Sequence, residues 1–150
     1  MDIIDGNDLL LYVNTSTEGE QEKWTAVANA TSHQITTSSE TKERVTKDVS
    51  GKWKGKQVTG LSCSIKCDAL VGKEGYGYKE LLKIQKAGEA VKLKYGFRDS
   101  VAAAGDEYEE GLFIITTLER NDPAKEDSTM SATFENTGEV LTKKIVAAGA

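Results

Sequence analysis

The sequence predicts a mainly β fold: two packed antiparallel sheets, as a sandwich or a partly closed barrel, with one flanking α-helix. Several segments alternate apolar and polar residues with the two-residue period of a strand. Turn-forming residues separate these segments roughly every eight to twelve positions. Only one segment has the spacing of a helix. No internal repeat or domain boundary is visible, so we expect a single domain over residues 1–150.

The N-terminal third combines apolar strands with a long polar segment. Strands are expected at 8–14 and at 24–35, the second as one strand or a broken pair. From Thr36 to Trp53 the chain is rich in Ser and Thr and carries charges of both signs. So long a stretch with little to bury is rare in a compact domain unless it is functional or disordered. We predict an ordered loop, at about 40–56, that docks on another molecule.

The clearest alternation occurs in the strand predicted at 57–67. Its apolar face carries Leu61, Cys63, Ile65 and Cys67. Residues four apart in a strand are separated by roughly 13 Å, whereas a disulfide requires Cα atoms about 5.5 Å apart. We therefore expect two buried free thiols rather than a disulfide or a metal site.

The C-terminal half is predicted to contain the one helix and the remaining strands. The helix covers about 76–87, and Gly88 stands where a left-handed residue ends a helix. With no second helix to pack on, it is expected to cover an open part of the sheet. Further strands are predicted at 89–97, 108–119, 128–135 and 140–146.

The strand at 108–119 is expected to be partly covered on both faces. Apolar or Thr side chains occupy both of its alternating sets of positions. One face carries Leu112, Ile114, Thr116 and Leu118, and the other carries Phe113, Ile115 and Thr117.

Composition and charge exclude several classes of function. The net charge of −5 argues against a protein that grips nucleic acid, which requires clustered Lys and Arg. No apolar run approaches membrane-spanning length and the N-terminus is acidic, so we expect synthesis and folding in the cytoplasm. His33 is the single histidine, and the sequence shows no catalytic or phosphate-binding motif. We therefore expect a binding or assembly module without enzyme activity or cofactor.

Short motifs in a characteristic order extend over nearly the whole chain. They are GNDLLLYV from Gly6, Trp24, Val27-Ala28, Thr31-Ser32-His33, Ser38-Ser39-Glu40-Thr41, Thr46-Lys47-Asp48, Gly51-Lys52-Trp53, Asp68-Ala69-Leu70, Tyr108-Glu109-Glu110-Gly111 before Ile115-Thr116 and Leu118, and Ser131-Ala132-Thr133-Phe134 before Gly138. In order and spacing they resemble the major tail tube proteins of long-tailed bacteriophages, in the form found in phages with flexible non-contractile tails. The segment after Leu141 departs from the family pattern.

The resemblance implies a structural protein of the virion tail. In this family two packed sheets and one helix form the subunit, six subunits close into a ring, and stacked rings form the tube through which the genome is ejected. Expected partners are further copies of the chain, the tape measure protein, the tail terminator and the baseplate or tail-tip proteins. Double-stranded DNA would pass through without specific binding. Assembly is expected in the cytoplasm of the bacterial host.

The resemblance also suggests roles for two sets of residues. The loop at about 40–56 would reach the adjacent ring, although Trp53 fits the subunit's own core as an alternative. The inter-ring contacts are expected from Lys42, Arg44, Val45, Lys47, Asp48, Val49 and Trp53. Carboxylates facing the channel would repel DNA, with a solvated outer surface as the alternative. These carboxylates are Glu40, Glu43, Asp106, Glu107, Glu109 and Glu110.

Two other functions stay open on the sequence alone. The inner tube of a contractile injection system, of a phage-tail-like or type VI-like kind, has a related subunit but differs in possessing a sheath and a spike. A small-ligand carrier or hydrolase built on a β-barrel would require a deep apolar pocket, and the sequence offers no catalytic residues to accompany one.

Overall fold

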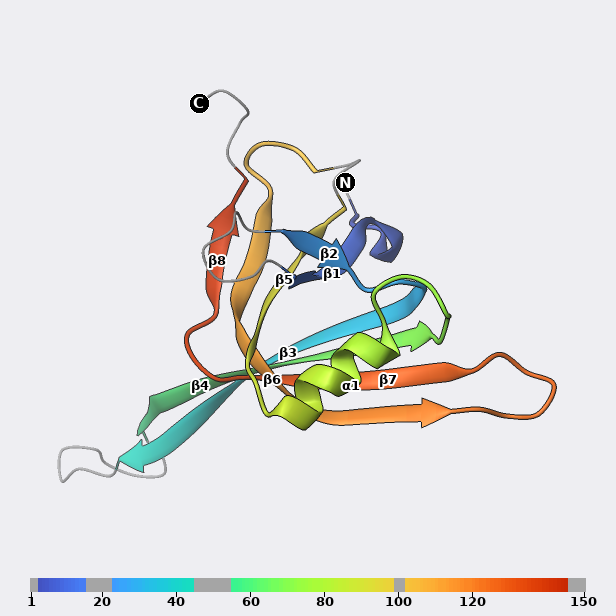
Figure 1. Cartoon of the computed structure of the whole chain (residues 1–150). Helices are drawn as coiled ribbons and strands as arrows, with labels where there is room; N and C mark the ends of the chain where they lie inside the picture. Colours follow the sequence, from blue (N-terminus) through green and yellow to red (C-terminus); the bar gives the residue numbers. More distant parts are fainter. Residues whose placement is uncertain (1–2, 16–22, 45–54, 99–101, 146–150) are drawn as a thin grey trace.

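The computed structural model describes residues 3–15, 23–44, 55–98 and 102–145, and all structural statements concern this part of the chain. Its eight strands are β1 (Leu9–Asn14), β2 (Trp24–Ala26), β3 (Ala30–Arg44), β4 (Gly55–Leu70), β5 (Val91–Phe97), β6 (Glu107–Asn121), β7 (Thr129–Asn136) and β8 (Leu141–Lys144). They form one sheet in the order β2-β1-β5-β6-β7-β4-β3, with β8 paired to β6 (Figure 1). The predicted mainly β, antiparallel fold with one helix is confirmed, although the strands form a single open sheet and not a closed barrel.

Strand β6 joins two halves of this sheet because it is long and changes partners. Its first part pairs with β8 and β5 as far as Phe113, and its second part pairs with β7 from Phe113 to Asn121. A β-bulge lies between Ile115 and Thr117, and bulges bend strands in this way. We call β1, β2, β5, β8 and the first part of β6 the upper half-sheet. The lower half-sheet consists of β3, β4, β7 and the second part of β6 (Figure 1).

The hydrophobic core lies between the two half-sheets and under the helix α1 (Tyr78–Ala87). Leu81 of α1 is fully buried in it. The other core side chains include Leu11, Val13 and Leu93 from the upper half-sheet and Ile65, Cys67, Met130, Ala132 and Phe134 from the lower one. Full burial of a Leu or Phe side chain contributes about 1.5–3 kcal/mol, so this cluster holds the half-sheets and the helix together.

The helix ends as predicted and begins two residues later than predicted. The Gly77 N–H donates to a Glu80 carboxylate oxygen at 2.9 Å, which satisfies one of the donors at the helix start. Gly88 follows the last turn with φ of 70°, a left-handed conformation that glycine adopts without steric cost. No helix in the described residues is long and apolar enough to cross a membrane.

The predicted long loop is wrong at both of its ends. Strand β3 continues to Arg44 and β4 begins at Gly55, so residues 40–44 and 55–56 are paired strand. A strand that is exposed on both faces shows no apolar alternation, so its composition resembles that of a loop. The backbone N–H and C=O groups that face the neighbouring strand are nevertheless hydrogen-bonded to it. Residues 45–54 lie outside the described part of the chain.

Strand β6 differs from its predicted alternation. Phe113 and Ile115 are buried, whereas Leu112 and Ile114 on the opposite face are 48% and 40% exposed. Because the bulge adds one residue to β6, Leu118 lies on the same face as Phe113 and packs against the core. The prediction that Leu118 lies on the same face as Leu112 is therefore wrong, whereas the partial exposure of Leu112 and Ile114 agrees with a face that is partly covered.

Two further predictions are confirmed. The segment at 24–35 is a broken pair, because β2 and β3 are separated by a turn in which Asn29 has φ of 58°. Asn tolerates this left-handed conformation better than most residues. Cys63 and Cys67 are both buried and form no disulfide.

Candidate assembly interface

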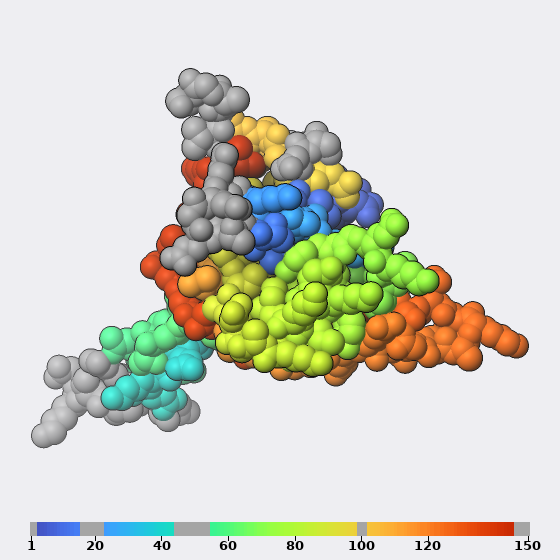
Figure 2. All heavy atoms as spheres, viewed as in Figure 1, coloured from blue at the N-terminus to red at the C-terminus, as the bar shows by residue number. Residues whose placement is uncertain are grey.

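The outer part of the β3–β4 hairpin is exposed on both faces. Strand β7 pairs with β4 only between Ser64 and Leu70, so beyond this point β3 and β4 form a two-stranded ribbon. We call this ribbon, residues 37–44 and 55–62, the arm. It projects on the opposite side of the body from the β6–β7 hairpin (Figures 1 and 2). An isolated two-stranded ribbon is at best marginally stable in water, so the arm is suited to packing on another molecule.

One face of the arm continues the apolar face of the core. Leu61 lies on the same face of β4 as the buried Ile65. A β-bulge makes Thr41 pair with Val58, which brings Val58 to this face as well. Leu61 is 69% exposed and Val58 is 56% exposed. Exposed apolar side chains that extend a core in this way are typical of a surface that is covered in an assembly.

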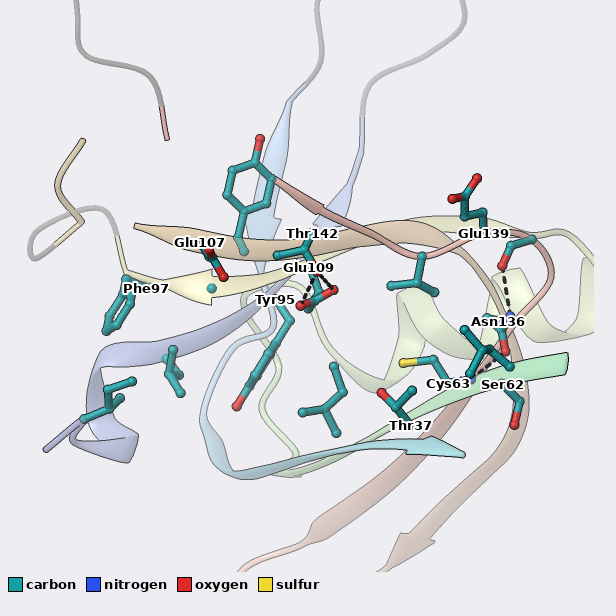
Figure 3. Close-up of a pocket in the computed structure, with 18 residues that line it drawn as sticks. Thr37, Ser62, Cys63, Tyr95, Phe97, Glu107, Glu109, Asn136, Glu139 and Thr142 are labelled. Atoms are coloured by element: carbon teal, nitrogen blue, oxygen red, sulfur yellow. Dashed lines mark hydrogen bonds between the residues drawn. The ribbon is translucent and has the colours of Figure 1, made fainter. Parts of the chain in front are cut away.

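A groove of about 590 Å³ opens between the base of the arm and the upper half-sheet. Figure 3 shows Thr37 and Cys63 on the side of the arm, with Tyr95 and Glu109 on the side of the upper half-sheet. The Thr142 hydroxyl of β8 lies 2.8 and 2.9 Å from the two carboxylate oxygens of Glu109, to which it donates. The apolar lining includes Ile4, Leu9, Ile35, Leu61, Phe97 and Val140.

A buried ion cluster fixes β8 to the rest of the upper half-sheet. Glu110 is 6% exposed, and its carboxylate oxygen Oε1 lies 2.9 Å from Lys92 Nζ and 3.2 Å from Lys143 Nζ. Burial alone would raise the pKa of Glu110, but hydrogen bonds from the two lysines outweigh it and hold the pKa below its ordinary value. The carboxylate therefore stays charged and links β5, β6 and β8.

Burial shifts the pKa values of two titratable groups in the core and at its border. Burial raises the pKa of the Cys67 thiol to about 12, so the thiol is protonated at neutral pH. Burial also lowers the pKa of His33, against the opposing effect of the Asp68 carboxylate. The His33 ring packs edge-on against Tyr95 with ring centroids 5.7 Å apart, which joins β3 to β5.

The face of the lower half-sheet that points away from the core is broad and polar. The helix and the upper half-sheet pack on the opposite face. By register, most of the side chains on the outward face are hydroxyls or amides, namely Ser32, Gln34, Thr36, Ser38, Ser62, Ser64, Thr117, Thr129, Ser131 and Thr133. The charged residues at its outward positions are Glu40, Asp68, Glu119 and Glu135 against Lys42, Lys66 and, by register, Arg44. Carboxylates thus outnumber basic residues on this face.

The lower half-sheet ends in two edges without a strand partner among the described residues. Strand β3 pairs only with β4, and β6 beyond Phe113 pairs only with β7. Three successive antiparallel pairings make β3 run opposite to β6. A second copy in the same orientation would therefore present its β6 antiparallel to β3, so the antiparallel pairing of the sheet could continue between copies.

The residues predicted for ring-to-ring contact lie at or beyond the end of the arm. Lys42 is an exposed arm residue, and Arg44 is the last residue of β3. The remaining predicted contacts, Val45, Lys47, Asp48, Val49 and Trp53, lie outside the described residues. Val58 and Leu61 were not predicted as contacts. The alternation that identifies the face of Leu61 does not show where the core ends, and the bulge that brings Val58 to this face has no signal in the sequence.

The carboxylates predicted for the channel are not brought together. Glu40 and Glu43 are arm residues, and Asp106 accepts the Ala103 N–H at 2.9 Å in the turn before β6. Glu107 and Glu109 line the groove, whereas Glu110 is buried in its ion cluster. The sequence pattern did not single out the other carboxylates of the polar face, which are Asp68, Glu119 and Glu135.

Comparison with known proteins agrees with this geometry. Residues 3–142 match the model of a family described as phage tail tube protein. A search of curated protein sequences finds no match.

Several solved structures share the fold at low sequence identity. The tail of an empty gene transfer agent (GTA) particle, refined with C6 symmetry, has a TM-score of 0.75 and 16% identity over 94% of this chain and 99% of that chain. The SPP1 tail tube has a TM-score of 0.72 and 12% identity over 97% of this chain and 81% of that chain. The sheath-tube complex of PVC, an extracellular contractile injection system, has a TM-score of 0.63 and 12% identity over 95% and 93%.

Proposed function

Because the chain belongs to the phage tail tube protein family, we propose that its tube consists of stacked hexameric rings that conduct DNA into the host. The chain is a structural protein of the virion tail and not an enzyme. The main support for a ring is that the lower half-sheet has two edges, β3 and the second part of β6, without a strand partner among the described residues. These edges run in opposite directions, so they could pair between copies. The C6 symmetry of the similar GTA tail supports six copies.

In this proposal the ring closes by sheet extension. The β6 edge of one copy pairs with the β3 edge of the next, so the lower half-sheets continue around the ring and no edge remains exposed. The covered face of the lower half-sheet, with α1 and the upper half-sheet on it, then forms the outside of the wall. The polar face forms the inside.

The same closure gives the channel its chemistry. The polar face would present hydroxyl and amide groups to DNA, with the four carboxylates Glu40, Asp68, Glu119 and Glu135 in excess over the three basic residues Lys42, Arg44 and Lys66. A surface with this charge repels phosphate. It has few basic side chains that could displace counterions from DNA, so DNA should slide without binding. Among the predicted channel carboxylates, only Glu40 lies on this face by register.

We assign the contact between successive rings to the arm and the residues beyond it, from about 40 to 56. The arm projects from the body and exposes both faces, so it can reach a neighbouring ring without unfolding the subunit. In this function the tube would meet a tape measure protein, a tail terminator and baseplate or tail-tip proteins, and it would assemble in the host cytoplasm.

Replacing residues 42–57 by an Asn-Gly turn tests the outer part of the arm, because Thr41 and Val58 are a cross-strand pair and would flank the turn. Both strands would still close as a hairpin, so we expect a folded monomer by circular dichroism and no tubes by negative-stain electron microscopy. A Gly/Ser segment of the original length is the matched control, because it separates length from side-chain chemistry. Tubes formed by the shortened chain at the wild-type protein concentration would rule out the replaced residues as the ring-to-ring contact.

A contractile injection system is the second candidate. The likeness to the PVC sheath-tube complex favours it, since that assembly has the same subunit fold. The gene neighbourhood separates the two candidates: a sheath gene beside this one indicates a contractile system, and a tape measure gene without a sheath gene indicates a non-contractile tail.

A further inference from the structure

The outward side of α1 is uniformly basic. Lys79, Lys83 and Lys86 recur at helical spacing, so they lie together on the side opposite the buried Leu81. We call these three residues the lysine stripe. None of them makes an ion pair with another described residue. The one acidic residue of α1, Glu80, is engaged at the helix start. A concentrated basic stripe is unusual in a chain with a net charge of −5.

The groove at the base of the arm has the opposite charge. Glu107, Glu109 and Glu139 line it, and Lys144 is the one lysine that pairs across the ladder from any of them. Below this acidic rim lies the exposed apolar face of the arm, with Leu61 in the groove and Val58 further out. The groove therefore offers carboxylates above and apolar surface below.

The two surfaces lie on different parts of the subunit. Helix α1 packs over β6, where the Arg120 guanidinium lies 5.1 Å from the centre of the Tyr78 ring, so the helix lies near the free β6 edge. The groove lies over β3 and β4, near the other edge. Figure 2 shows α1 on the near face of the body. One subunit cannot bring its own α1 into its own groove.

We propose that α1 of one copy docks at the groove of the next copy, with the lysine stripe against the carboxylates and the helix over the exposed apolar face of the arm. The proposal rests on the ring described above. If β6 of one copy joins β3 of the next, the sheet continues across the junction and carries α1 to the neighbour's covered face. The contact is heterologous, so repeating it closes a ring. The opposite charges of the two surfaces should speed association at low salt, and the contact should weaken as salt screens them.

Charge reversal tests the docking. The triple variant K79E/K83E/K86E is expected to remain a folded monomer, because all three side chains are exposed. It should raise the protein concentration needed for ring or tube formation by about tenfold or more at low salt. The single variant K83E should show a smaller increase than the triple variant. The matched control for K83E is K125E, in the exposed β6–β7 turn, which should assemble as the wild type does.

A second reversal identifies the partner surface. E107K/E139K alone should also impair assembly, and mixing it with the triple helix variant should restore rings, since the reversed charges again face each other. The proposal fails if the triple variant assembles as the wild type does. It also fails if the two reversed proteins do not rescue each other. A wild-type protein that stays monomeric at all concentrations would overturn the proposed ring itself. That result differs from the other two, in which the wild-type protein assembles.

Discussion

Strands β3 and β4 form one continuous ladder whose two halves have opposite surroundings. At the base, β7 is a third strand and the core covers one face, so Ile65 is 1% exposed. In the arm, four residues away on the same face, Leu61 is 69% exposed. Both halves pair the same two strands in an antiparallel register, and each half contains one register shift. The difference lies in what packs over the ladder and not in the ladder itself.

This comparison shows that the apolar face of one ladder can continue from the core into a segment that nothing in the same subunit covers. The base supplies enough burial to hold the register of both strands, and the arm keeps that register without burial of its own. The apolar side chains of the arm therefore add little to the stability of a monomer. In the ring that we propose, a second copy would cover them.

The largest effect is expected at the base of the hairpin. Ile65→Ala removes buried methyl groups from the centre of the core, and such substitutions cost about 2–5 kcal/mol. Urea denaturation of the monomer measures this as a lower midpoint with an unchanged slope. A loss below about 1 kcal/mol would show that the base is as loosely packed as the arm, and the comparison would fail.

Much of this fold can be predicted from the sequence, and the reason differs between regions. Strand β7 and the base of β4 alternate clearly because one face is buried and the other is solvated, so strands were correctly predicted there, and Cys63, Ile65 and Cys67 are buried as expected. The end of α1 is marked by Gly88, whose left-handed conformation leaves a local signal. In these regions the local pattern and the tertiary packing agree.

The arm and the polar face were not predictable in the same way. Thr37 to Glu43 are exposed on both faces, so they carry no period that separates a strand from a loop. The bulges next to Thr41 and Thr117 change which face of the sheet the following residues lie on, and no pattern in the sequence marks them. Residues such as Glu119 and Glu135 come together only through strand pairing, which single-sequence periodicity does not contain.

An intermediate effect is expected at the boundary between base and arm. There the Asn136 side chain accepts the Cys63 N–H at 2.8 Å and donates to the Gly138 carbonyl at 2.9 Å, just past the last β4–β7 pair. Asn136→Ala leaves a part-buried N–H without this partner, so we expect a loss of about 1–2 kcal/mol in urea denaturation. Thr137→Ala is the matched control and should lie within about 0.5 kcal/mol of the wild type. Equal losses in both variants would show that the boundary is not set by Asn136.

The smallest effect on the monomer is expected in the arm. Leu61→Ala removes the same kind of side chain from the same face as Ile65→Ala, but the side chain is already in water. The free energy of unfolding should therefore change by no more than about 0.5 kcal/mol. Assembly should suffer instead, because the lost apolar area would be buried between copies, and sedimentation velocity should show rings only at several-fold higher protein concentration. A variant that is as destabilised as Ile65→Ala would place Leu61 in the monomer's own core. A variant that is stable and assembles normally would leave the apolar face of the arm without a role in the tube.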